Sequence, residues 1–170
     1  MIATVRATRE HALALGPRLL GADELEVRAS SGMEPTEACE SSVAASQEAY
    51  ALVVEGEVLA LWGVAPLGAW HLFGALRPGA VWCLVSRDAP RHRRLLARRS
   101  RAALEDLLTR WDWLGNYVDA RYVSALRWVQ WLGFHVAPHA VPWGVARLPF
   151  HEIYIRAPAR AGLPDLPRAA

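Results

Sequence analysis

The chain has 170 residues, and its hydrophobic fraction of 53% indicates a globular domain with a core of its own rather than a disordered chain. The formal net charge of +2 is too small to indicate a nucleic-acid partner by itself, and all 19 basic residues are arginines because lysine is absent. Cys39 and Cys83 form no CxxC pair, so we expect neither a disulfide framework nor a zinc site.

The first half of the chain predicts a strand, three helices and a β-hairpin. Gly56 separates two segments rich in valine and leucine, which is the pattern of a hairpin. The expected elements are a strand at 2–7, helices at 10–20, 22–31 and 35–46, and hairpin strands at 50–55 and 58–65. Residues 58–76 carry no charged side chain and are long enough to span a membrane, but glycines and Pro66 interrupt them. We therefore expect a buried strand followed by an apolar loop, and no membrane span.

The second half predicts alternating strands and helices. Residues 81–86 (VWCLVS) form an almost continuous apolar run, as expected for a central strand that is covered on both faces. The other expected elements are the longest helix at 91–110, a strand at 114–118, a helix at 121–132, and strands at 134–137 and 150–156. We expect a single domain over residues 1–156, followed by a loose tail of alanine, proline and arginine over residues 157–170.

The most informative stretch is 114–134, LGNYVDARYVSALRWVQWLGF. It predicts a short strand, a turn, a helix and the start of another strand. Asp119 is placed to cap the helix, because its carboxylate can accept hydrogen bonds from the first helical turn. Gly133 is placed to end the helix in a left-handed conformation, and Phe134 follows at once as the start of the next strand.

The packing face of this helix resembles a known pattern. Tyr122, Ala125 and Val129 share one side at helical spacing, and Gly-Phe follows them. This arrangement resembles the carboxy-terminal half of the GNAT fold, that of the Gcn5-related N-acetyltransferases, where the same places hold Asn, Ala, Tyr and Gly-Phe. The packing positions match the family, and the two chemical positions do not.

The resemblance implies an α/β (α+β) fold over residues 1–156. Its mixed central sheet would have six to seven strands flanked by helices, in the order β-α-α-ββ-β-α-β-α-β-β. In active members of the family, the helix tyrosine gives a proton to the departing thiolate. Val129 occupies that place and cannot donate a proton, and Tyr122 is expected to be a packing residue. We therefore expect no catalytic residue.

The loop that would hold the coenzyme diphosphate also departs from the family's glycine-rich pattern. It reads Ser86-Arg87-Asp88-Ala89-Pro90-Arg91-His92, with no glycine between positions 79 and 115. Pro90 lacks an amide donor, and Asp88 is expected to place a negative charge where phosphates would lie. We expect no cofactor, or acetyl-CoA if the chain is an active transferase. Should an anion or coenzyme A site persist, its candidate residues are Ser86, Arg91, His92 and Arg93.

Other candidates for chemistry are weak. Glu34, Glu37 and Glu40 lie at helix ends near the expected cleft and could act as a general base, but solvated surface carboxylates are the simpler interpretation. The six histidines are scattered, and Pro138 excludes a helix that would bring His135 and His139 together as metal ligands. We expect no metal site.

A second resemblance depends on five motifs in order. They are DELEVRASSGMEP at 23–35, VWCLVSRD, an arginine-rich helix, NYV, and the WLGF helix end. Together they resemble the internal virion protein family of short-tailed bacteriophages, whose members are GNAT-like. This implies a virion-associated protein without acetyltransferase activity that acts through protein–protein contacts. It would be made in the host cytoplasm and then held in the virion.

Two alternatives stay open. One is an active acyl-CoA-dependent N-acyltransferase, and the other is a packaging factor that contacts nucleic acid through the arginines of 91–101, for which a solvated helix face is the simpler reading. The partners expected for a virion protein are other virion proteins or a second copy of the chain. Trp70 and Trp143 are candidates for that contact surface, because large aromatic side chains commonly anchor interfaces.

Overall fold

The structure is a computed structural model, and it describes residues 1–67 and 77–158. Trp70 and most of the tail over 157–170 lie outside these ranges. The helices of the described part are α1 (Arg9–Leu15), α2 (Gly21–Ser31), α3 (Pro35–Ala45), α4 (Arg93–Leu107) and α5 (Val123–Leu132). Its strands are β1 (Ile2–Arg6), β2 (Glu48–Val54), β3 (Glu57–Pro66), β4 (Pro78–Val85), β5 (Trp113–Asp119), β6 (His135–Val136), β7 (Val141–Trp143) and β8 (Leu148–Arg156).

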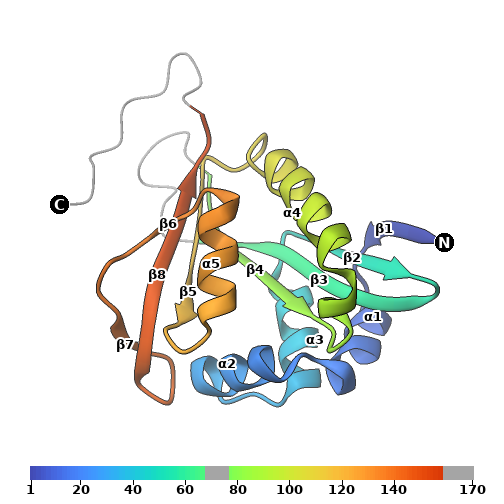
Figure 1. The fold of residues 1–170 in the computed structure, drawn as a ribbon, viewed down its shortest axis with the longest axis horizontal. Coiled ribbons are helices and arrows are strands. Elements are labelled where there is room, and N and C mark those ends of the chain that lie inside the picture. The colour runs from blue at the N-terminus through green and yellow to red at the C-terminus, as the bar shows by residue number, and fades with distance from the viewer. Residues whose placement is uncertain (68–76, 159–170) are drawn as a thin grey trace.

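The strands form one mixed sheet of eight strands in the order β1-β2-β3-β4-β5-β8-β6, with β7 pairing beside β8. Only β4 and β5 pair in parallel, and all other neighbours are antiparallel. Helices cover both faces (Figure 1). The mixed α/β GNAT fold predicted from the sequence is therefore confirmed, with β7 as a strand that the sequence pattern did not predict.

Two hydrophobic layers hold the helices on the sheet. On one face, Leu15 of α1 and Cys39 of α3 pack against Leu61 and Leu84 of the central strands. On the other face, Leu104 and its neighbours on α4 and α5 pack against the opposite sides of the same strands. Strand alternation explains this division, because successive side chains point to opposite faces. β3 is therefore buried along most of its length, whereas most residues of β4 are only half-buried, so the central strand expected at 81–86 is covered only in part.

Several local predictions are confirmed by backbone geometry. Glu55 and Gly56 both have positive φ, of 53° and 88°, which is the turn that matches the twist of a two-residue hairpin. Gly32 and Gly133 end α2 and α5 in the left-handed conformation, with φ of 77° and 102°. No helix within the described ranges is long and apolar enough to cross a membrane.

The end of α4 is fastened to the sheet by a buried carboxylate. Glu48 of β2 is 7% exposed and accepts hydrogen bonds from Arg110 at 2.9 Å, from the indole N–H of Trp111 at 2.6 Å and from the Tyr50 hydroxyl at 2.8 Å. Arg110 also pairs with Asp106, at 2.7 Å, but that carboxylate is largely exposed. One guanidinium thus binds a buried partner and an exposed one.

This pair of partners gives a test of what holds the fold together. We expect Glu48→Ala to lower the free energy of unfolding by about 1–3 kcal/mol, because it leaves the buried indole N–H of Trp111 without its acceptor and removes a partner from the half-buried Arg110 and Tyr50. Asp106→Ala is the matched control and should cost less than about 1 kcal/mol, since exposed ion pairs contribute little. Urea denaturation followed by tryptophan fluorescence would measure both. Equal losses would show that the Glu48 contacts do not fasten the fold.

Candidate functional site

The strands β4 and β5 diverge from one end of the sheet to the other. They pair only where residues 78–80 meet residues 113–115, and beyond that point they separate (Figure 1). At the point of separation the Asn116 side chain donates from Nδ2 to the Val81 carbonyl at 2.7 Å, and its Oδ1 accepts from the Tyr117 N–H. A side-chain amide thus stands where strand pairing would continue. The result is a V-shaped opening in the middle of the sheet.

Glycines allow this narrow end to close tightly. A Cβ at Gly79 would lie 2.2 Å from the Val64 side chain and 2.8 Å from the Trp111 ring. A Cβ at Gly115 would lie 2.1 Å from the ring of Trp113. Both contacts are far too short for carbon atoms. Glycine is therefore needed here for close packing under tryptophan rings.

A cavity of about 680 Å³ extends through the V. Strand residues from Val81 to Val85 and from Asn116 to Val118 form two of its walls. The inner sides of α4 and α5 line it on one side of the sheet, and α2 and α3 line it on the other. The cavity therefore connects the two faces of the sheet. Its lining is largely apolar, which is usual for a small-molecule site.

The main chain of β4 faces this cavity with alternate residues. The Val81 carbonyl accepts from Asn116, while Val85 donates its N–H to Asp23 and accepts at its carbonyl from Leu20. Since strand groups alternate in direction, Cys83 between them also points its N–H and carbonyl into the gap. The pairing with β5 has ended by then, so this N–H has no strand partner among the described residues. It is a donor available to a ligand.

Asp23 bridges the wide end of the V. It is 4% exposed, and its carboxylate accepts from the Val85 N–H at 2.7 Å and from the Tyr122 hydroxyl at 2.7 Å. One contact belongs to β4 and the other to the residue that precedes α5. Burial raises the pKa of Asp23 to about 6, and the two hydrogen bonds only partly oppose this effect. Tyr122 packs against the core as expected, and its hydroxyl in addition forms a polar contact at the cavity.

Glu26 lies one helical turn after Asp23 and also lines the cavity. One of its oxygens accepts from the Asp119 N–H at 2.7 Å. Burial, and then the nearby Asp23 and Asp119 carboxylates, raise the pKa of Glu26 to about 7. A carboxyl group with a pKa near neutrality can both take up and release a proton at physiological pH.

Asp119 itself is only partly the cap that the sequence predicts. Its side chain accepts from the Arg121 N–H at 2.8 Å and pairs with the Arg121 guanidinium at 2.6 Å. The helix α5 begins later, at Val123, with Tyr122 as its N-cap residue. The carboxylate therefore fixes the turn between β5 and α5. This turn places the Tyr122 hydroxyl against Asp23.

The turn after β4 has no spare amide for a diphosphate. The N–H groups of residues 86, 87, 89 and 91 all donate to main-chain carbonyls, and the N–H of Asp88 donates to the Ser86 hydroxyl. Pro90 has no N–H at all. The main-chain N–H groups of residues 86–91 are therefore all engaged in hydrogen bonds that stabilise the turn itself. The glycine-free sequence therefore corresponds to a turn that is complete by itself.

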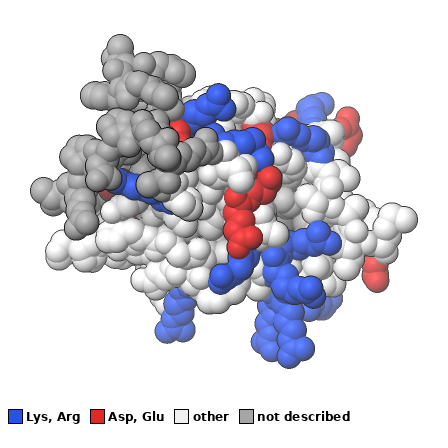
Figure 2. Space-filling view, turned by 90° about the horizontal axis from the view of Figure 1, so that it is seen from above, with Lys and Arg blue, Asp and Glu red and all other residues white. Residues whose placement is uncertain are grey.

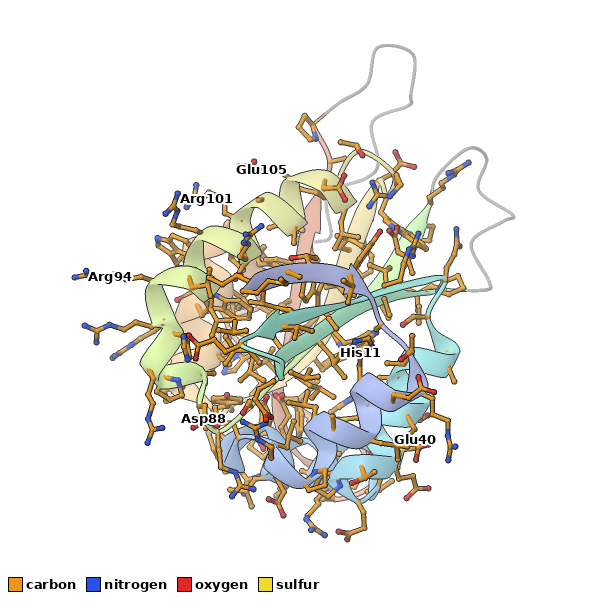
Figure 3. The ribbon with its side chains drawn as sticks, turned by 90° about the vertical axis from the view of Figure 1, so that its right-hand side faces the viewer. His11, Glu40, Asp88, Arg94, Arg101 and Glu105 are labelled. Carbon is orange, nitrogen blue, oxygen red and sulfur yellow. The ribbon has the colours of Figure 1, made fainter. Side chains whose placement is uncertain are left out.

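Asp88 lies at the turn, as expected, but its charge is paired there and the residue does not line the cavity. Its carboxylate pairs with Arg18 at 2.9 Å and with Arg91 at 3.3 Å, and these cations hold the pKa of Asp88 below its usual range. The residue faces a smaller hollow beside the hairpin between β2 and β3. It places no unpaired negative charge in the cavity, and Figure 3 shows it next to the start of α4.

The four candidate anion-site residues do not come together. Arg93 lines the large cavity, at the start of α4. Arg91 and His92 line the smaller hollow with Asp88, and Ser86 is fully buried under the turn. The structure thus places only one of the four beside the cavity, and their role in binding stays a prediction.

The remaining candidates lie at the rim or on the surface. Trp143 is 41% exposed and its ring stacks on Tyr117, with 3.8 Å between the ring centres. Glu34 and Glu40 pair with arginines at the surface, Glu37 is exposed, and none of the three lines the cavity. Residues 1–67 and 77–158 contain no cluster of three or more potential metal ligands.

Solved structures with the same fold are numerous. The chain is similar to the ribosomal-protein-S18-alanine N-acetyltransferase from Escherichia coli, with 16% identity, a TM-score of 0.60, and 97% of this chain and 100% of the other covered. It is also similar to a putative acetyltransferase from Salmonella typhimurium solved with acetyl-CoA, with 14% identity, a TM-score of 0.63 and coverages of 95% and 96%. A putative phosphinothricin N-acetyltransferase gives 12% identity, a TM-score of 0.66 and coverages of 94% and 100%.

No family model and no curated protein matches the sequence. The likeness to solved structures therefore shows the GNAT acetyltransferase fold and no more. Nothing among these comparisons supports the phage, virion or structural-protein expectation.

The raised pKa of Glu26 predicts how stability changes with pH. The folded state binds this proton more tightly than the unfolded state, so the stabilisation is present at low pH and is lost as pH rises through about 7. As the pH rises from about 4 to about 8, titration of Glu26 should lower the unfolding free energy of the unsubstituted chain by about 3 kcal/mol. The Glu26→Gln variant should not show this loss. Glu24→Gln, on the exposed side of the same helix, should keep the original pH dependence. Chemical denaturation across this pH range would measure all three, and identical slopes would contradict a buried titrating Glu26.

Proposed function

We propose that this chain is an acyltransferase that moves an acyl group from a thioester to a primary amine. The single observation that carries the proposal is the cavity through the V of β4 and β5, which is lined by a strand amide without a partner among the described residues, a buried carboxyl group and a half-buried one. The amide belongs to Cys83, and the carboxyl groups belong to Asp23 and Glu26. A cavity that connects the two faces of the sheet lets donor and acceptor approach from opposite sides.

The thioester donor is assigned to the side of the sheet that carries α4 and α5. An acyl thioester of pantetheine would supply an acyl group activated on sulfur. The slot between the strands suits the pantetheine portion, which is narrow and bears amides that could meet the exposed strand groups. The turn at 86–91 does not suit a diphosphate, because its N–H groups are already used. The residues therefore fit the thioester arm better than the rest of coenzyme A.

Acyl transfer forms a carbon–nitrogen bond and breaks a carbon–sulfur bond. One proton must leave the amine, and one must reach the departing sulfur. We assign the Cys83 N–H to the acyl carbonyl oxygen, where negative charge develops during the reaction. We assign proton removal from the amine to Glu26, whose pKa of about 7 lets it act as a base at neutral pH.

Tyr122 is assigned as the proton donor to sulfur. Its hydroxyl lies at the wide end of the V, and its hydrogen bond to Asp23 fixes the direction of the group. Burial and the Asp23 carboxylate raise the pKa of Tyr122, so the hydroxyl carries its proton at neutral pH and is present as a donor when the thiolate departs. The sequence position that the family uses for this role holds Val129, and Tyr122 reaches the cavity from the preceding turn instead.

The acceptor is assigned to the side formed by α2 and α3. Asp23 and Glu26 on α2, and Ser41 and Ser42 on α3, line this part of the cavity. Buried carboxyl groups attract a protonated amine, and serine hydroxyls can accept or donate further hydrogen bonds. The proposed acceptor is therefore a small molecule or peptide end that carries a primary amine.

Amine-dependent thiol release tests this function. The purified chain would be incubated with acetyl-pantetheine and a panel of primary amines, and the freed thiol measured with a thiol reagent. We expect Tyr122→Phe to lower kcat by on the order of 100-fold, the usual contribution of a positioned proton donor. Tyr50→Phe is the matched control, because that hydroxyl binds Glu48 away from the cavity, and it should keep most of the activity.

The pH profile separates the two proton transfers. Activity of the unsubstituted chain should rise through about pH 7, and Glu26→Gln should lose this limb together with most of kcat. Absence of amine-dependent release from acetyl-pantetheine, acetyl-CoA and an acetylated carrier protein would refute the proposed function. Equal activity of the Tyr122 and Tyr50 variants would refute the assignment of the donor.

A further inference from the structure

The exposed side of α4 carries an array of unpaired cations. Five of its arginines are exposed, and none of them forms an ion pair with a carboxylate of the described residues. They are Arg93, Arg94, Arg98, Arg99 and Arg101. Figure 3 shows Arg94 and Arg101 extending away from the body of the protein, and Figure 2 shows basic side chains gathered along one edge. Their charge is therefore free to act on a partner.

Three of these arginines form a row on α4 that meets exposed residues of the neighbouring helix α5. Arg94, Arg98 and Arg101 follow one another at helical spacing, and the Arg101 guanidinium lies over the ring of Trp131 on α5, 4.6 Å from its centre. Arg127 is exposed and lies one turn before Trp131 on the same side of α5. We call Arg94, Arg98, Arg101, Arg127 and Trp131 together the arginine strip. Trp131 is 49% exposed within it, and arginine with an exposed tryptophan is a combination typical of interface hot spots.

The arginine strip lies over the donor side of the cavity. The inner sides of the same two helices line the cavity, with Ala97 and Ser100 on α4 and Ser124 and Trp128 on α5. A molecule bound on the outer side of this helix pair would thus lie next to the space assigned to the thioester. The strip is part of the surface around the proposed donor site.

The size of the strip does not match a small phosphate group. From Arg94 to Arg101 it covers about 10 Å along α4 by the rise of an α-helix. The turn at 86–91, where a coenzyme diphosphate would need main-chain donors, has none to give. Cations spread over two helices around an aromatic ring suit a protein surface better than one small anion.

A nucleic acid suits the strip less well. Glu105 is exposed and lies four residues after Arg101, so a negative charge ends the row. Figure 3 shows Glu105 on the same helix, beyond Arg101. A phosphate backbone needs cations along its length, and the net charge of the chain is only +2. A short row of cations is sufficient for a compact acidic protein.

We propose that the acyl donor is a thioester on the phosphopantetheine arm of an acidic carrier protein that docks on the arginine strip. The arm would pass between α4 and α5 into the V of the sheet. This proposal rests on the proposed acyl transfer, because only a thioester donor gives the arm a reason to enter. A carrier-bound arm has no diphosphate, so the turn at 86–91 needs no free amides. The acidic surface of the carrier would instead pair with the exposed arginines.

Binding tests the proposal without knowledge of the acceptor. A fluorescently labelled, acetylated bacterial acyl carrier protein would be titrated with the chain and followed by anisotropy. We expect Arg98→Glu to weaken binding on the order of tenfold, because reversal of one interface charge slows association and weakens the complex. Arg147→Glu is the matched control, since it reverses an exposed arginine in the turn before β8, and should change affinity by less than about twofold. Added salt should weaken the complex.

A second variant guards against a purely electrostatic effect. Trp131→Ala keeps every charge and should still weaken carrier binding, because it removes the aromatic anchor and the stack under Arg101. Acetyl-CoA should compete with the carrier only weakly, and its own affinity should be unchanged by Arg98→Glu.

The remaining outcomes assign failure to one proposal or the other. No carrier binding, or equal effects of the Arg98 and Arg147 variants, would overturn the carrier proposal. A DNA duplex that binds through Arg98 where the carrier does not would overturn it in favour of nucleic acid. Acyl transfer from acetyl-pantetheine without carrier binding would overturn only the carrier proposal. Carrier binding without transfer from any thioester would overturn the proposed function, and the donor role with it.

Discussion

The parallel pairing of β4 and β5 ends after three residue pairs, and the Asn116 amide then occupies the place of the next main-chain contact. Everything proposed for this protein depends on that early end. It leaves main-chain groups of a central strand without partners, which is costly inside a sheet unless something else satisfies them. Asn116 satisfies one end of the gap and Asp23 the other. The main-chain groups of Cys83 between them have no strand partner among the described residues.

The two carboxyl groups that line the cavity are not explained by a contribution to the stability of the fold. Burying Asp23 and Glu26 opposes their ionisation, and both are held in place by hydrogen bonds from main-chain groups of the strands. Apolar residues at the same positions of α2 would pack against β4 and β5 without this cost. Destabilising groups that face a cavity are typical of sites kept for function. The enzymatic interpretation explains their presence, and a passive role in an assembly does not.

The fold could be predicted from sequence because periodicity reports burial. The run at 81–86 and the spacing from Tyr122 to Val129 fixed the central strand and the helix that covers it. β7 was missed because three residues that include Pro142 give no alternation to detect. Site residues were harder, since they depend on contacts distant in sequence. Glu26 could have been suspected, because it lies one helical turn after Asp23 on the same side of α2, but its contact with Asp119 spans the domain.

Side-chain direction at the turn after β4 could not be predicted either, because Arg18, which draws Asp88 away, belongs to the amino-terminal part of the chain. The same turn has a consequence for how this protein could change its donor. Replacing Pro90 with glycine would restore a single N–H while the neighbouring amides stayed occupied. No one substitution would convert the turn into a nest for phosphates. If the proposed donor is right, the choice of donor depends on the main chain of this turn, and a single substitution there would not change it.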